Sequence, residues 1–156
     1  MKVFISYGDA ADQVTALRLQ ALGAANGLTV YVPPAHTRQG TAAFLDPNAG
    51  QKLNEAEVVL GFIGNGLSEA CRQEINTGMT LGKNMIVMSY PHLAQQLREY
   101  FGQKLVVIDP VNPDVSERRI VQHLKQIDAQ QNAKKALLAL GTLALGLLIL
   151  APADQS

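Results

Sequence analysis

Glu74 is the residue of this sequence whose type and position are best suited to chemistry. Ser68, Cys71 and Glu74 follow one another at intervals of three residues, so on a helix they lie on one face. A carboxylate in the second turn of such a helix can point into a cleft and stabilise positive charge that develops during a reaction. Spacing alone also allows another interpretation, in which Glu74 is solvated and pairs with an exposed cation such as Lys52.

The two neighbours of Glu74 in this pattern also have simpler interpretations. Ser68 precedes the helix and Glu69 stands in its first turn, which is typical of a helix start. Cys71 is predicted to be a small buried residue, because no histidine is placed near it to activate a nucleophile. It is the only cysteine, so the chain has no internal disulfide, and the three dispersed histidines show no metal-binding spacing.

Five apolar segments of strand type alternate with helical segments along the chain. This alternation predicts a parallel sheet with helices on both faces. The strands are expected at residues 2–7, 28–32, 58–63, 85–88 and 105–108. Helices are expected from Asp9 or Asp12 to a stop at Gly27, over 69–81 before Gly82, from Pro91 to about 100, and from Asp114 or Ser116. In the first helix Val14, Leu17, Ala21 and Leu22 are predicted to share one face.

Residues 33–50 are rich in Pro, Gly, Ala, Thr and Asn and are predicted to form a long loop with at most a short helix. In a parallel sheet ligands bind outside the carboxyl ends of the strands, so the candidate segments are 6–12, 33–50, 64–74 and 89–92. Neither of the two common glycine-rich phosphate-binding motifs occurs, which argues against a dinucleotide-dependent dehydrogenase and a P-loop enzyme. A phosphorylated receiver domain is also unlike this chain, because Ser6 and Gly64-Asn65 stand where its acidic residues would be.

Two segments together resemble the Toll/interleukin-1 receptor (TIR) domain family in its bacterial branch. They are Lys2-Val3-Phe4-Ile5-Ser6-Tyr7 with Asp9, and Ser68-x-x-Cys71-Arg72-x-Glu74-Ile75 followed by residues 82–87. Their order and separation match the family across about residues 1–128. The resemblance implies an α/β fold, a flavodoxin-like three-layer sandwich with a five-stranded parallel sheet, here followed by a C-terminal hydrophobic helix.

Enzymatic members of that family cleave the nicotinamide–ribosyl bond of NAD, and the resemblance places their catalytic glutamate at Glu74. It implies NAD⁺ as substrate, no separate cofactor or metal, self-association through the domain, and a role in bacterial antiphage or stress defence. It also implies a substrate-binding pocket formed by Ser6, Tyr7, Gly8, Pro33, Pro34, His36, Arg38, Ser68 and Cys71. Nicotinamide leaves NAD⁺ as a neutral molecule, so one carboxylate can suffice without a general acid.

Several of these residues keep alternative interpretations. Tyr7 or Tyr31 either stacks on a ring of the substrate or packs in the core. His36 either contacts a phosphate or is solvated. Two features depart from the family pattern: Ala70 stands where many members carry Trp, and the loop after the second strand offers only His36 and Arg38 as basic residues.

Residues 136–151 form a run of sixteen residues without a charge, which follows Lys134 and Lys135. As a helix it reaches about 24 Å, short of a hydrocarbon core of about 30 Å. Three alternatives are a membrane anchor with its amino side in the cytoplasm, a helix for oligomer contacts, and a helix docked on its own domain. The sequence thus predicts a TIR-like domain at 1–130 and a basic-flanked tail at 131–156.

A formal net charge of zero argues against a general nucleic-acid binder. A single cysteine and the lack of a secretory segment predict a cytoplasmic domain, attached to the inner membrane if the tail is an anchor. Two alternatives to NAD cleavage stay open: a non-enzymatic TIR scaffold at a membrane, and an enzyme of the nucleoside deoxyribosyltransferase type, which uses a carboxylate at a sugar C1.

Overall fold

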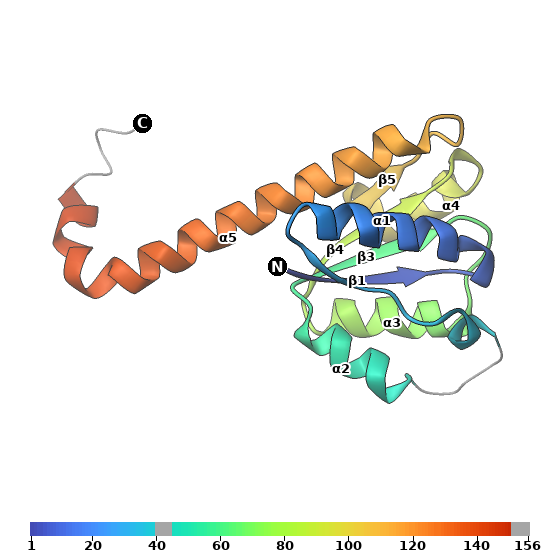
Figure 1. Cartoon of the computed structure of the whole chain (residues 1–156), viewed down its shortest axis with the longest axis horizontal. Helices are drawn as coiled ribbons and strands as arrows, with labels where there is room; N and C mark the ends of the chain where they lie inside the picture. The colour runs from blue at the N-terminus through green and yellow to red at the C-terminus, as the bar shows by residue number, and fades with distance from the viewer. Residues whose placement is uncertain (40–44, 151–156) are drawn as a thin grey trace. The chain divides into compact units, whose positions relative to one another are not determined.

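The computed structural model describes residues 1–39 and 45–150 (Figure 1). The chain divides into two units, Met1–Val121 and Gln122–Ser156, which are described separately. The strands of the described part are β1 (Lys2–Tyr7), β2 (Thr29–Tyr31), β3 (Val58–Ile63), β4 (Asn84–Ser89) and β5 (Leu105–Val107). Its α-helices are α1 (Gln13–Ala25), α2 (Pro47–Glu55), α3 (Glu69–Thr80), α4 (Pro91–Phe101) and α5 (Pro113–Leu150). Short 3-10 helices lie at η1 (Ala10–Asp12), η2 (Ala35–Arg38) and η3 (Gly102–Lys104).

The five strands form one parallel sheet in the order β2-β1-β3-β4-β5, so the predicted α/β fold with a five-stranded parallel sheet is confirmed. This is the flavodoxin-like strand order. The chain adds strands to one side of β1 and then to the other, so the switch point of the sheet lies between β1 and β3. The two strands pair so that Ser6 lies beside Gly61 and Tyr7 beside Phe62. The carboxyl end of β1 therefore stands at the point where ligands bind in sheets of this kind.

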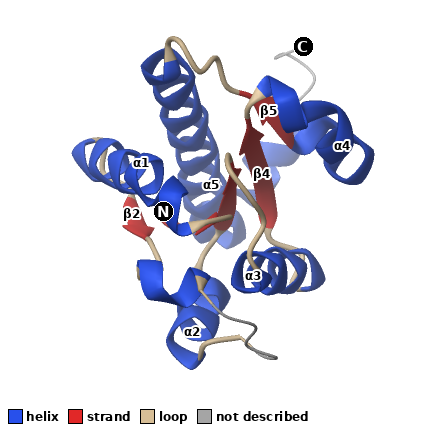
Figure 2. Cartoon of the chain, turned by 90° about the vertical axis from the view of Figure 1, so that its right-hand side faces the viewer, coloured by secondary structure: helices blue, strands red, loops and turns tan. Residues whose placement is uncertain are grey.

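Helices cover both faces of the sheet (Figure 2). α2, α3 and α4 lie over one face, and their core residues gather around Phe4, Val59 and Val87 of the strands. On the other face α1 and the beginning of α5 are joined by an ion pair of 2.5 Å between Arg18 and Glu117. Side chains alternate along a strand, so Ser6 lies on the same face as Phe4 and points toward α3.

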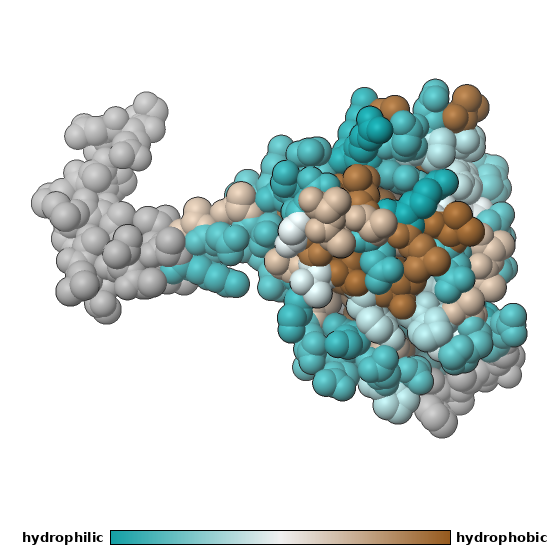
Figure 3. Space-filling view, in the orientation of Figure 1, coloured by the Kyte–Doolittle hydropathy of each residue, from teal (hydrophilic) through white to brown (hydrophobic). Residues whose placement is uncertain are grey.

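The apolar face predicted for α1 is not the face that packs on the sheet. Val14 and Leu17 are 63% and 44% exposed, and the side that packs on the sheet carries Ala16 and Leu19. The helix is apolar on nearly all sides, so its sequence holds no stripe that distinguishes one face from the other. In Figure 3 hydrophobic residues gather on the face where α1 lies in Figure 1.

The loop predicted for residues 33–50 is interrupted earlier than expected, because α2 begins at Pro47. The Asp46 carboxylate caps this helix by accepting a hydrogen bond of 3.1 Å from the Ala49 N–H, and Pro47 fits the first turn. Two predicted stops are confirmed, since Gly27 and Gly82 follow their helices with φ of 81° and 69°.

α5 runs without interruption from Pro113 to Leu150, where the sequence suggested a helix followed by a separate tail. The side chains of 136–150 and all of residue 151 lie outside the described part, so the predicted membrane anchor falls there. Among the described residues, no helix combines the length and the apolar character that crossing a bilayer requires.

Candidate functional site

Glu74 lies in the second turn of α3 and is 1% exposed, which excludes the interpretation as a solvated charge. The start of α3 fixes its place. The Ser68 hydroxyl accepts a hydrogen bond of 3.3 Å from the Cys71 N–H, and the Ser68 N–H donates one of 2.6 Å to the Gly8 carbonyl. The helix is thereby tied to the residue that follows β1, and its inner face meets the carboxyl end of that strand.

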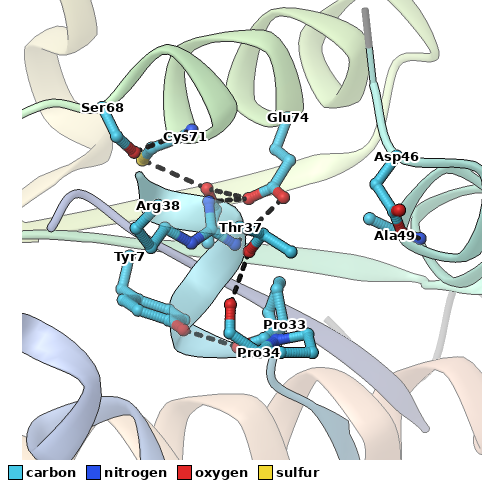
Figure 4. A network of polar contacts seen from close by, with 11 residues as sticks. Tyr7, Pro33, Pro34, Thr37, Arg38, Asp46, Ala49, Ser68, Cys71 and Glu74 are labelled. Carbon is cyan, nitrogen blue, oxygen red and sulfur yellow. Dashed lines mark hydrogen bonds and ion pairs between the residues drawn. The ribbon is translucent and has the colours of Figure 1, made fainter. Parts of the chain in front are cut away.

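Arg38 pairs with Glu74 through both carboxylate oxygens (Figure 4). Its Nη1 donates to Oε1 at 2.8 Å and its Nη2 donates to Oε2 at 3.0 Å. The two side chains are 0% and 2% exposed, so this is a buried ion pair. Its two parallel hydrogen bonds are the bidentate geometry in which a guanidinium and a carboxylate match best. Opening a buried pair by removing one partner costs about 3–5 kcal/mol.

Tyr7 supports Arg38 from the side away from α3. The guanidinium carbon lies 4.4 Å from the centre of the Tyr7 ring, which is a cation–π contact. The Tyr7 hydroxyl donates a hydrogen bond of 2.5 Å to the Pro33 carbonyl. Tyr7 is fully buried, so in this structure its ring packs on Arg38 and offers no face to a ligand.

A short hydrogen-bonded chain holds Glu74 from the sheet side. Ser6 Oγ lies 2.8 Å from Glu74 Oε1 and 3.1 Å from Cys71 Sγ. One hydroxyl carries one proton, so when Ser6 donates to the carboxylate it must accept from the Cys71 thiol. Burial raises the pKa of that thiol to about 12, which keeps its proton in place. Ser6 and Cys71, both predicted to bind substrate, therefore orient Glu74.

The electrostatics of the pair reflect opposing effects. Burial raises the pKa of the Glu74 carboxyl above its ordinary value, while the bonds from Arg38 and Ser6 act in the other direction. For Arg38, burial lowers the pKa, but the hydrogen bonds and charge of Glu74 outweigh it, so the pKa is raised and the guanidinium stays charged. The site thus holds a carboxylate whose charge is balanced by one internal cation.

A cavity of about 270 Å³ adjoins the pair. α3 contributes Ala70 and Glu74 to its wall, and η2 contributes His36 and Thr37, the two residues that precede Arg38. The Thr37 hydroxyl donates to the Pro34 carbonyl at 2.5 Å and so ties the 3-10 turn to its own start. Typical ligand pockets measure about 300–1,000 Å³, so this cavity is too small for a whole dinucleotide as it stands.

Gly8 has a structural role beside the site. A Cβ added there would lie 1.8 Å from the Gly66 carbonyl oxygen, so the loops after β1 and β3 touch through bare backbone. Gly8→Ala is expected to lower the free energy of unfolding by about 1–3 kcal/mol, measured by urea denaturation. Gly66→Ala is the matched control, because its added Cβ meets nothing closer than 3.4 Å. Equal stability of the two variants would contradict this role.

The structure gathers five of the predicted site residues into one cluster, which consists of Ser6, Tyr7, Arg38, Cys71 and Glu74. Gly8, Ser68, Pro33 and Pro34 support this cluster through backbone and capping bonds. His36 lies on the cavity wall. Tyr31 packs on Phe4 with ring centres 5.5 Å apart.

Sequence reasoning missed one buried carboxylate at the same sheet edge. Asp12 is 1% exposed and does not cap α1 with its side chain, as one alternative predicted. It accepts hydrogen bonds from the Gly64 and Asn65 N–H groups at 3.2 and 3.3 Å, and from the Asn65 side chain at 2.5 Å. Asp12 thus accepts from three donors of the loop after β3 and fixes that loop. The only signal in the sequence is an acidic residue five positions after the end of β1.

Comparison with known proteins identifies no relative of this chain. A scan against protein-family models finds no match to the chain, and a search of curated proteins finds none either. Within the part of the chain that the structure describes, no three His, Cys, Asp or Glu side chains gather in a way that could hold a metal ion. The chemistry available at the site is that of one buried carboxylate, its guanidinium partner and the adjoining cavity.

Proposed function

We propose that this chain cleaves the nicotinamide–ribosyl bond of NAD⁺, with Glu74 as the catalytic carboxylate. The observation that carries the proposal is the position of Glu74, buried beside the end of β1 at the switch point of the sheet and bordering a cavity. Ser6 Oγ donates to its Oε1 from the sheet side, and this bond can orient the carboxylate whether or not Arg38 holds it as at rest. Preorganised charge of this kind is the usual source of electrostatic catalysis.

The reaction suits a site with one carboxylate. The bond between ribose C1 and the pyridinium nitrogen breaks, and its electron pair leaves with neutral nicotinamide. Positive charge then develops on the ribosyl group, and a carboxylate placed beside it stabilises the transition state more than the ground state. Water completes hydrolysis to ADP-ribose by forming the new C–O bond and losing a proton, whereas attack by a nitrogen of the adenine gives a cyclic product.

A nicotinamide-release assay tests the proposal. The full chain is incubated with NAD⁺, and nicotinamide, ADP-ribose and cyclic ADP-ribose are separated and quantified. Release of nicotinamide in proportion to protein supports the proposal, and the second product distinguishes hydrolysis from cyclisation. Base exchange on deoxynucleosides with no action on NAD⁺ would favour the deoxyribosyltransferase alternative instead.

The pH profile gives an independent prediction. Glu74 must be ionised to stabilise positive charge, and burial raises its pKa above its ordinary value. We therefore expect kcat/KM to fall as the pH is lowered, along an acidic limb whose midpoint lies above about 4.3, the value of a free glutamate. Initial rates of nicotinamide release between pH 4 and 8 measure this limb. A profile that stays flat down to pH 4 would contradict the assignment of Glu74.

We further propose that the site is completed by self-association, as the TIR resemblance implies. The small cavity supports this, since a dinucleotide needs more room than about 270 Å³. The specific activity is then expected to fall on dilution, and a value independent of protein concentration would argue for a self-sufficient monomer. Attachment of the 131–156 tail to a membrane remains a prediction, which fractionation of expressed protein with and without detergent tests.

A further inference from the structure

Arg38 occupies the place beside Glu74 where, in the proposed reaction, the positive charge of the substrate has to be stabilised. Both of its Nη atoms are within 3.0 Å of the two carboxylate oxygens, and its side chain is fully buried. A cationic substrate that approaches these oxygens meets a guanidinium that already neutralises them. Since one carboxylate balances one positive charge, full pairing of a substrate cation with Glu74 requires that Arg38 give up its place.

Charge balance restricts what can replace Arg38. Glu74 is 1% exposed, and leaving its carboxylate buried without a counter-ion is strongly unfavourable. A ligand that carries its own positive charge restores the balance when the guanidinium leaves. A neutral ligand does not restore the balance. It either binds without displacing Arg38 from Glu74 or leaves the carboxylate buried without a counter-ion. The same exchange separates NAD⁺, whose pyridinium ring is cationic, from NADH, whose dihydropyridine ring is neutral.

The resting pair is also incompletely satisfied. The Arg38 Nε is buried and finds no hydrogen-bond partner among the described residues, although each of the two Nη atoms donates to Glu74. An unmade bond of this kind weakens the resting arrangement relative to one in which every donor is used. Arg38 is thus held firmly enough to neutralise Glu74 and less firmly than a fully bonded guanidinium would be.

We propose that Arg38 is a specificity-determining residue, an internal cation that neutralises Glu74 at rest and yields the carboxylate only to a ligand with its own positive charge. The inference rests on the proposed function for the identity of the ligand, an N-ribosyl pyridinium cation. It differs from the role that the TIR resemblance implies, in which Arg38 contacts the substrate. The two roles predict opposite effects of removing the guanidinium.

Binding of two ligands to the full chain tests the exchange. Carba-NAD⁺ keeps the pyridinium charge but cannot release nicotinamide, and NADH has the same pyrophosphate and adenosine without that charge. Calorimetric titration is expected to give carba-NAD⁺ at least about a tenfold lower Kd than NADH for the wild-type chain. Equal affinities would overturn the proposal. Glu74→Gln, which has no carboxylate charge to balance, is expected to bind the two ligands with similar affinity.

Removal of the internal cation gives the decisive comparison. Arg38→Ala is expected to bind carba-NAD⁺ at least about tenfold more tightly than the wild type, because the competitor is gone. Guanidinium chloride at about 10 mM, far below denaturing concentrations, should compete with carba-NAD⁺ in this variant and leave the wild type unaffected. Weaker binding by Arg38→Ala would overturn the proposal and assign Arg38 to substrate contact.

Arg38→Lys covers the case in which Arg38→Ala does not fold, because lysine keeps the charge and loses the two-pronged contact. It is expected to bind carba-NAD⁺ a few fold more tightly than the wild type, and weaker binding again overturns the exchange. Nicotinamide release is measured separately on the same samples. If the variants bind carba-NAD⁺ more tightly but no sample releases nicotinamide, only the proposed function is refuted. If nicotinamide is released but both variants bind carba-NAD⁺ more weakly than the wild type, only the exchange is refuted.

Discussion

Arg38→Met lowers the free energy of unfolding by about 3–5 kcal/mol, because it leaves the Glu74 carboxylate buried without its counter-ion. Methionine fills much of the space of the arginine side chain, so the loss reports the missing charge and hydrogen bonds more than a cavity. Urea denaturation of the two proteins at neutral pH, followed by circular dichroism, measures the difference.

Arg72→Met is the matched control for this prediction. Arg72 also pairs with a glutamate, but its distance to Glu69 is 3.7 Å and the two side chains are 57% and 45% exposed. Exposed pairs contribute at most about 1 kcal/mol. A second comparison is the double variant Arg38→Met with Glu74→Met, which removes both charges and is expected to recover most of the lost stability. An Arg38→Met protein no less stable than Arg72→Met would show that the buried pair does not form.

The sign of the pH dependence follows from the raised pKa of Glu74. Arg38 lowers that pKa, so its removal raises the pKa further. A carboxyl whose pKa is higher in the folded than in the unfolded state binds more protons when folded. The contribution of such a carboxyl to stability is complete when the pH is below its pKa in the unfolded state, about 4.3. It is lost as the pH rises through its pKa in the folded state. The deficit of Arg38→Met is therefore expected to be smaller at pH 5 than at pH 7.5.

If the chain cleaves NAD⁺ as proposed, Glu74→Gln is expected to reduce the rate of nicotinamide release by about 10²–10³-fold, since the amide has nearly the same shape but no charge to stabilise the transition state. The loss is expected in kcat, because the interaction strengthens as the bond breaks. Glu69→Gln changes an exposed glutamate on the same helix and should leave the rate unchanged. Circular dichroism on both variants confirms that the fold is retained.

The sheet could be predicted from the sequence because strands buried on both faces appear as continuous apolar runs. β3 is buried at all six positions, and its bounds match the prediction. The parallel arrangement then predicts that Ser6 and the start of α3 lie at the same edge of the sheet. The structure has Ser6 beside this helix, with its Oγ 2.8 Å from Glu74 Oε1.

The ion pair could not be predicted, because it depends on how a loop folds back on the sheet. Arg38 and Glu74 are 36 residues apart, and periodicity carries no information about such a contact. The available signals were the scarcity of cations after the second strand and a glutamate on an otherwise buried helix face. The buried side of α1 could not be predicted either, because Val14 and Leu17 on the exposed side are as apolar as Ala16 and Leu19 on the buried side.

The proposed function requires that the Glu74 carboxylate, which Arg38 neutralises at rest, takes part in cleavage of NAD⁺. The most direct measurement is the time course of nicotinamide release from NAD⁺ by the concentrated wild-type chain, with Glu74→Gln and Glu69→Gln measured in parallel. The wild type and Glu69→Gln are expected to release nicotinamide, and Glu74→Gln is expected to release it about 10²–10³-fold more slowly. No release by the wild type at any protein concentration, or equal release by Glu74→Gln, would contradict the proposed function, and absent release would favour a scaffold without enzymatic activity.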